Sequence, residues 1–260
     1  MLHIRIGVQL ASLRQPFKKA LQTAARLGAD AVEIDARGEI NPNEMTRTAT
    51  RHILKMLEDL NLKVCAVSFR TRRGYDVLEE LDRRVEATKQ AMQMAYDLGA
   101  QVVVNQVGRV PTDFESPSSE LLVQTLTDIG RHGQRVGAFL AAKTGSEDPA
   151  DLLQLVDHLP PGSLTVDFDP GNLIINGFSA SDAVRSLGQH VIHVHAHDGV
   201  RDLAQGRGLE VPLGRGSADF PEILGVLEER EYRGYLTVER EKADDPIAEV
   251  QQAIQFLRNL

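Results

Sequence analysis

The chain is short of cysteine, of long apolar runs and of basic residues. Its single cysteine, Cys65, cannot form a disulfide within the chain, so we expect a reducing, cytoplasmic setting. No apolar run approaches the roughly 18 residues of a membrane span, and we expect no membrane partner. The segment Met1–Gln9 is too short and too polar to predict a signal peptide.

The charge balance excludes some classes of partner. The 260 residues include 29 Lys and Arg against 37 Asp and Glu, a formal net charge of −8. A general nucleic-acid binder would need a basic surface, so we expect no nucleic-acid partner. The 42% of hydrophobic residues and 25% of charged residues are typical of a globular protein.

Short apolar runs rich in β-branched residues alternate along the chain with longer amphipathic stretches. The expected strands are Ile4–Val8, Ala31–Ile34, Lys63–Phe69, Gln101–Asn105, Ala138–Ala142, Leu164–Phe168, Val191–His195 and Tyr235–Val238. The expected helices are Pro16–Leu27, Asn43–Leu60, Val77–Leu98, Ser118–Val136, Pro149–His158, Ser179–Leu187, Asp219–Glu229 and Pro246–Leu260. Such alternation predicts parallel strands joined by right-handed crossovers.

Eight strand–helix units predict an α/β protein with a single (β/α)8 TIM barrel over residues 1–260. The alternative is a doubly wound open sheet, which usually carries a glycine-rich phosphate turn after its first strand. The segment Gln9–Leu13 has no glycine, which favours the barrel and argues against a nucleotide cofactor.

In a TIM barrel the active site lies at the carboxyl ends of the strands. Polar residues at these expected ends are Glu33, Asp35, Arg70, Asn105, Lys143, Asp167, Asp169, Asn172, His193, His195, His197 and Glu239. Carboxylates and imidazoles that converge there suit a divalent metal, although any one of them alone is more often a structural hydrogen-bonding group. Of the histidines, we expect His195 to be a ligand or donor, His193 to lie deeper in the barrel and His197 to lie at its rim.

Five segments resemble those of the xylose isomerase-like TIM barrels, the sugar phosphate isomerases and epimerases. They are Ala31–Ile34, Asp167–Asn172, His193–Asp198, Val211–Phe220 and Tyr232–Glu239, and their order and spacing match over nearly the whole chain. Relatives include ketose 3-epimerases, hydroxypyruvate isomerase, inosose dehydratase and endonuclease IV. The resemblance therefore defines the superfamily better than the substrate.

The resemblance implies four metal ligands, in the order Glu, Asp, His and Glu. Asp169, His195 and Glu239 match the last three, whereas Lys143 stands in the place of the first Glu. The implied cofactor is a divalent metal, Mn, Mg or Zn, and Lys143 argues against it. An ammonium about 4 Å from a dication is repelled by about 8 kcal/mol at an effective dielectric constant of 20.

Three interpretations of Lys143 stay open. Its ammonium takes the place of the metal between Asp169 and Glu239 and polarises a substrate carbonyl. Alternatively, the three remaining ligands still hold a metal, or the site binds a ligand without catalysing a reaction.

The implied activity is that of a sugar, sugar-phosphate or sugar-acid isomerase or epimerase, which moves a proton next to a carbonyl. Its expected catalytic residues are Glu239 and Lys143. Expected substrate contacts are Glu33, Arg70, Asn172, His197, Arg201 and Glu210. The arginines favour an anionic substrate. The long segment from Asp198 to Gly216, with Gly206 and Gly208, is expected to be a lid-like loop.

Two other functions are open. One is a non-catalytic protein that binds a sugar-like ligand on the same scaffold. The other is an apurinic endonuclease-like hydrolase, against which the net charge of −8 and the incomplete ligand set both argue. The expected partner is a small carbohydrate-like molecule, and the sequence leaves a homo-oligomer open.

Overall fold

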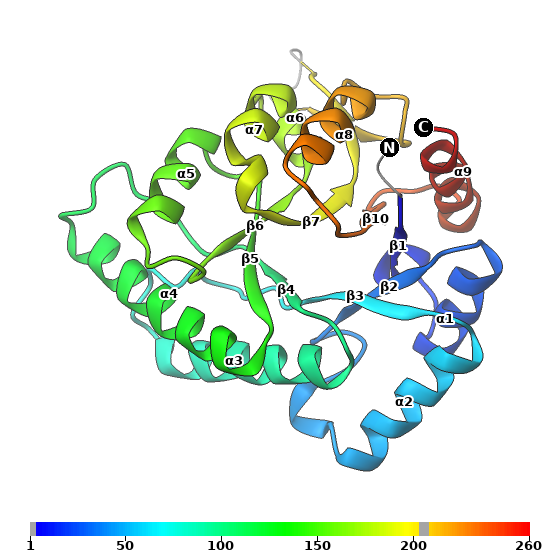
Figure 1. Cartoon of the computed structure of the whole chain (residues 1–260), viewed down its shortest axis with the longest axis horizontal. Coiled ribbons are helices and arrows are strands. Elements are labelled where there is room, and N and C mark those ends of the chain that lie inside the picture. The colour runs from blue at the N-terminus through cyan, green and yellow to red at the C-terminus, as the bar shows by residue number, and fades with distance from the viewer. Residues whose placement is uncertain (1–3, 203–207) are drawn as a thin grey trace.

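A computed structural model describes residues 4–202 and 208–260, and it forms a closed barrel of parallel strands (Figure 1). Around the barrel the strands follow the order β1-β10-β7-β6-β5-β4-β3-β2. They are β1 (Ile6–Gln9), β2 (Ala31–Asp35), β3 (Lys63–Ser68), β4 (Val102–Asn105), β5 (Phe139–Lys143), β6 (Thr165–Phe168), β7 (Val191–Ala196) and β10 (Leu236–Val238). The predicted (β/α)8 barrel is confirmed.

Helices follow the strands and surround the barrel (Figure 1). They are α1 (Phe17–Arg26), α2 (Arg47–Asp59), α3 (Leu81–Asp97), α4 (Pro117–Val136), α5 (Pro149–His158), α6 (Pro170–Ile175), α7 (Ala180–Leu187), α8 (Phe220–Glu229) and α9 (Pro246–Arg258). Short 3-10 turns are η1 (Leu10–Leu13), η2 (Pro42–Glu44) and η3 (Gly188–His190). Side-chain caps start several helices because they satisfy free backbone N–H groups; Ser116 and Asp148, for example, cap α4 and α5, each followed by proline. Among the described residues, no helix has the length and apolar content to cross a membrane.

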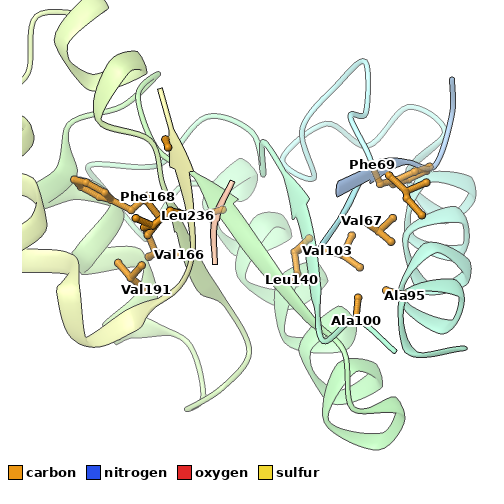
Figure 2. Close-up of a cluster of buried hydrophobic side chains, with 14 of the residues drawn as sticks. Val67, Phe69, Ala95, Ala100, Val103, Leu140, Val166, Phe168, Val191 and Leu236 are labelled. Atoms are coloured by element: carbon orange, nitrogen blue, oxygen red, sulfur yellow. The ribbon is translucent and has the colours of Figure 1, made fainter. Parts of the chain in front are cut away.

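The main apolar core lies between the strands and the surrounding helices. Val67 of β3 and Val103 of β4 belong to this layer with Ala95 of α3, as Figure 2 shows. Successive strand residues point to opposite faces, so Val102 and Val104 belong to a separate small cluster with Ala66 and Ala141 inside the barrel.

The same alternation places polar residues inside the barrel at the carboxyl ends of its strands. On β2, Val32 and Ile34 pack in the outer core, and Glu33 between them is fully buried on the inner side. The strand register brings these polar residues to neighbouring positions: Gln9 pairs with Glu33, Lys143 with Asp167, and Asp167 with His193. The sheet itself therefore collects the polar side chains of the candidate site.

Several segments differ from the sequence-based expectation, and α2, for example, begins at Arg47 rather than at Asn43. The short helix α6 was not expected, and it forms because the Asp169 carboxylate accepts a hydrogen bond from the Asn172 backbone N–H while Pro170 starts the first turn. Helix α3 begins at Leu81 rather than at Val77.

The segment from Asp198 to Gly216 is not simply an open loop. It contains a two-stranded antiparallel sheet of β8 (Asp198–Val200) and β9 (Leu209–Val211), while Gly206 lies outside the described residues. The Asp198 carboxylate accepts hydrogen bonds from the backbone N–H groups of Gly214 and Gly216. A Cβ at Gly216 would lie 2.0 Å from Asp198 Oδ1, so this position requires glycine. One buried carboxylate thus fixes the end of the segment that was expected to be a lid.

Candidate active site

A cavity of about 180 Å³ opens at the carboxyl ends of the strands. It is lined by Gln9, Glu33, Ser68, Arg70, Thr71, Val104, Asn105, Gln106, Lys143, Asn172, His195 and Glu241. All of its lining residues except Val104 are polar or charged, and they include five of the residues that the sequence predicts for the site: Glu33, Arg70, Lys143, Asn172 and His195.

Lys143, the last residue of β5, lines this cavity and joins two buried carboxylates, neither of which is part of the lining in the described chain. Its Nζ lies 3.1 Å from Asp169 Oδ2 and makes a close contact with Glu239 Oε2. Burial alone would lower the pKa of Lys143, but the negative charges of Glu239 and Asp169 outweigh burial and raise this pKa above its usual value. The side chain is therefore an ammonium at neutral pH.

Nearby positive charges keep the two carboxylates, Asp169 and Glu239, ionised. Burial tends to raise the pKa of Asp169, but the charges of His197 and Lys143 outweigh it and hold this pKa below its usual range. Burial likewise opposes ionisation of Glu239, whose pKa is nevertheless lowered by Lys143 and His195. Each carboxylate thus depends on a buried cation.

Glu239 follows β10 and receives donors on both of its oxygens. Oε1 accepts hydrogen bonds from Arg70 Nη2 at 2.9 Å and from Gln9 Nε2 at 3.1 Å, while Oε2 faces Lys143. Arg70 also pairs with Glu241 at 3.0 Å. The Arg70 guanidinium is therefore engaged by two carboxylates at the open side of the cavity.

His195 lies between two other buried carboxylates. Its Nδ1 is 2.8 Å from Asp167 Oδ2, and its Nε2 is 2.9 Å from Glu33 Oε2. Burial would lower the pKa of His195, but the charges of Asp167 and Glu33 raise it well above its usual value. Gln9 Nε2 donates to Glu33 Oε1 at 3.0 Å and so connects this group with Glu239.

His197 and Glu210 support the site from outside the cavity. His197 Nδ1 lies 2.9 Å from Asp169 Oδ1, and its Nε2 lies 3.5 Å from Glu210 Oε1. Glu210 Oε2 also pairs with Arg240 at 2.8 Å. His197 was expected at the rim but is buried, with 4% of its side chain exposed. His197 contacts Asp169 directly and Glu210 contacts His197, so their geometry suits positioning of Asp169.

The remaining predicted residues lie in different surroundings. Asn172 lines the cavity and donates its backbone N–H to Asp169 Oδ1. Arg201 is exposed and, within the described residues, is not part of the cavity lining. Sequence reasoning did not single out Gln9, although its place at the end of β1 is the same signal that marked the other strand ends.

Two groups of side chains in the described residues could hold a metal ion. One comprises Glu33, His193 and His195, and the other Asp169, His197 and Glu239; the ligand atoms of each lie within 4.8 Å of one another. In the second group Lys143 Nζ already contacts Asp169 and Glu239. A dication between these carboxylates would meet the ammonium, so the residues present do not fit a metal at the place that the resemblance implies.

The fold and the convergence of acids, histidines and a lysine define a TIM-barrel protein with a polar candidate site at the carboxyl ends of its strands. The chain belongs to the xylose isomerase-like TIM barrel family, whose model matches residues 21–260.

Curated relatives are similar at low identity. The uncharacterized protein MJ1311 of Methanocaldococcus jannaschii is 28% identical over 181 residues, which cover 63% of this chain and 58% of that protein. This chain therefore spans less than two thirds of that relative's length. Inosose dehydratase of Clostridium beijerinckii is 23% identical over 260 residues, which cover 87% of this chain and 82% of the enzyme.

Solved structures share the fold. A xylose isomerase domain protein from Planctomyces limnophilus superposes with a TM-score of 0.85 at 24% identity, covering 98% of this chain and 96% of that chain. A xylose isomerase-like TIM barrel protein from Mycobacterium smegmatis, in complex with magnesium, has a TM-score of 0.78 at 16% identity, covering 100% and 97%. D-psicose 3-epimerase, determined in the presence of D-fructose, has a TM-score of 0.76 at 15% identity, covering 98% and 99%.

Proposed function

We propose that the chain is an isomerase or epimerase of a small carbohydrate and transfers a proton at the carbon next to a carbonyl group. The named relatives are a dehydratase and an epimerase, which supports an enzyme on this fold. The observation that carries the proposal is the buried Lys143 ammonium, which lines the cavity and contacts Glu239. This pair combines an electrophile with a base.

Lys143 is the proposed electrophile. An ammonium has three N–H donors; one is donated to Glu239, and the charge also pairs with Asp169 Oδ2 at 3.1 Å. A remaining N–H is available to a carbonyl oxygen in the cavity, where it would stabilise the negative charge that develops on that oxygen. The raised pKa disfavours the neutral amine that a Schiff base would need.

Glu239 is the proposed acid and base. Its carboxylate takes a proton from the carbon next to the carbonyl, which leaves an enediolate whose oxygen is held by Lys143. Return of the proton to the neighbouring carbon, with the hydroxyl proton of the enediolate passing to its other oxygen, gives the isomer. The epimer forms when a water molecule in the cavity protonates the same carbon from the opposite face and Glu239 returns its proton to the hydroxide that is left. A carbonyl that draws the ammonium toward itself also weakens the Lys143–Glu239 contact and makes the carboxylate a stronger base.

The other residues have positioning roles in this proposal. Glu33, Arg70 and Asn172 line the cavity, where they can bind substrate hydroxyl groups. His197 and Glu210 hold Asp169, and Asp169 in turn holds the ammonium. Arg70 is the arginine of the cavity lining that an anionic substrate would contact. Binding of the substrate would then weaken the ion pair between Arg70 and Glu241.

The proposal uses Lys143 where the resemblance implies a metal. The ammonium pairs with the carboxylates of both Asp169 and Glu239, so the reaction as proposed has no step through a metal at that place.

Exchange of solvent deuterium into a panel of ketoses, measured by proton NMR, tests this proposal. We expect exchange by the wild type, and a loss of about 100- to 1,000-fold in Lys143→Met because one oxyanion donor is removed. Glu239→Gln should lose about 100- to 10,000-fold because the base is gone. Lys55→Met, which changes an exposed lysine of α2, is the matched control and should retain the wild-type rate.

If no ketose of the panel, neutral or anionic, exchanges deuterium although ligands still bind, the proposed enzyme activity is wrong and the chain is a binding protein. Exchange that persists in Lys143→Met would contradict the role of the ammonium.

A further inference from the structure

Three buried polar atoms face one another at the inner end of the cavity. Glu33 Oε2 lies 2.9 Å from His195 Nε2 and 3.5 Å from His193 Nε2. At most 1% of each side chain is exposed. Within residues 4–202 and 208–260, none of the three atoms makes a hydrogen bond of acceptable geometry. Buried polar atoms normally have a partner, so this arrangement needs an explanation.

The surrounding residues orient these atoms. Asp167 accepts from His195 Nδ1, at 2.8 and 3.0 Å from its two oxygens, and so directs Nε2 of the same ring toward Glu33. Gln9 occupies the other oxygen of Glu33, at 3.0 Å, and leaves Oε2 for the histidines. A carboxylate that holds the second nitrogen of a histidine is the usual support of a metal-binding imidazole.

We propose that Glu33, His193 and His195 bind a divalent transition metal of the zinc type, at a site distinct from the carboxylates around Lys143. Zinc takes histidine nitrogen and carboxylate oxygen at about 2.0–2.2 Å, which places neighbouring ligand atoms of a tetrahedron about 3.4 Å apart. The separation of 3.5 Å between Glu33 and His193 fits this value, and the 2.9 Å between Glu33 and His195 must lengthen by about half an ångström.

The cavity provides the fourth coordination position. Glu33 and His195 both line the cavity, so a water molecule or a substrate oxygen can complete the coordination from there. His193 was expected from the sequence to be a satisfied interior residue, yet its Nε2 has no hydrogen-bond partner in the described chain.

The nearby ammonium does not exclude a cation at this place. Glu239 Oε2 contacts Lys143 Nζ and lies 3.8 Å from His195 Nε2, so a carboxylate lies between the ammonium and the proposed metal. The opposite side of the His195 ring carries the Asp167 carboxylate. The metal would replace the proton that these carboxylates otherwise hold on His195.

Metal titration of the chelator-treated full chain tests the inference. We expect about one equivalent of Zn²⁺ or Co²⁺ per chain, with cobalt absorption bands of an imidazole-bound ion. Glu33→Gln and His193→Gln should weaken binding about 100-fold or more, and Asp167→Asn about 10- to 100-fold because it only supports the ligand. His52→Gln, which changes an exposed histidine of α2, should bind as the wild type does.

Circular dichroism and thermal unfolding confirm that each variant is folded before its titration is interpreted. Failure of the wild type to bind Zn²⁺ or Co²⁺ would overturn the inference. Binding that survives His193→Gln but is lost in His197→Gln would also overturn it, because the ion would then belong to the group around Asp169. These measurements read binding alone, so they are independent of the proposed isomerase activity.

Discussion

Lys143 Nζ lies 3.1 Å from Asp169 Oδ2 although both side chains are buried, and the same ammonium contacts the buried carboxylate of Glu239. One cation is thus shared by two carboxylates from different strand ends, and Arg70 and His197 provide further positive charge beside Glu239 and Asp169. Buried ion pairs of this kind are not necessarily stabilising as a whole, but loss of one partner leaves charges that are buried and uncompensated.

Lys143→Met is therefore expected to lower the free energy of unfolding by about 3–5 kcal/mol. Urea denaturation followed by circular dichroism measures this change. The matched exposed change Lys55→Met should stay within about 0.5 kcal/mol of the wild type. A Lys143→Met protein as stable as the wild type would show that the ammonium does not neutralise the two carboxylates in solution.

The fold and the convergence of site residues could be predicted from the sequence, since both depend on local pattern. The alternation of strand and helix periodicity predicts the barrel, which the structure shows. The expected strand ends include Lys143, Asp169 and Glu239, which the structure brings into contact. The roles of individual partners could not be predicted in the same way. Whether Glu210 reaches the cavity or binds His197 depends on the β8–β9 sheet, and no hydrophobic periodicity in the sequence predicts that sheet.

The arrangement around His195 shows a second limit of sequence reasoning. His195 was expected to join Asp169 and Glu239 as a ligand, but its closest carboxylates are those of Asp167 and Glu33. The register between β6 and β7 shifts between Val166 and Asp167 and places Asp167 opposite His193, while Glu33 reaches His195 from β2. A register shift between two strands is not marked in the sequence of either strand alone.

Lys143→Glu should create an additional metal site. The change replaces the repelling cation with a third carboxylate beside Asp169 and Glu239, which gives an oxygen-rich site for Mn²⁺ or Mg²⁺. Elemental analysis after equilibration with Mn²⁺ should find about one more equivalent per chain in the variant than in the wild type. Equal metal content in the two proteins would contradict this expectation.

Glu210 is expected to make stability depend on pH in the acid range. Burial raises the pKa of Glu210, but hydrogen bonds with His197 and Arg240 outweigh burial and lower this pKa to about 2 from its ordinary 4.5. Its contribution is therefore present above pH 4.5 and is lost as the pH falls from 4.5 to 2.

Unfolding free energies measured from pH 7 downward check this dependence. The wild type should lose more stability across that acid window than Glu210→Gln does, whereas Glu58→Gln, which changes an exposed carboxylate of α2, should follow the wild-type curve. Parallel curves for the wild type and Glu210→Gln would contradict the assignment.

Cys65 is expected to be unreactive in the folded protein. It is 5% exposed, and burial raises the pKa of its thiol to about 12, so almost no thiolate is present at neutral pH. A chromogenic disulfide reagent should detect no thiol in the native chain and one thiol per chain in denaturant. Rapid reaction of the native protein would contradict the buried position of this strand residue.

Anomalous diffraction from wild-type crystals soaked in Mn²⁺ tests most directly whether an ammonium takes the place of the metal. The geometry around Lys143 predicts no anomalous peak between Asp169 and Glu239, with Lys143 Nζ in continuous density between their carboxylates. A manganese peak coordinated by Asp169 and Glu239, with Lys143 turned away, would contradict it.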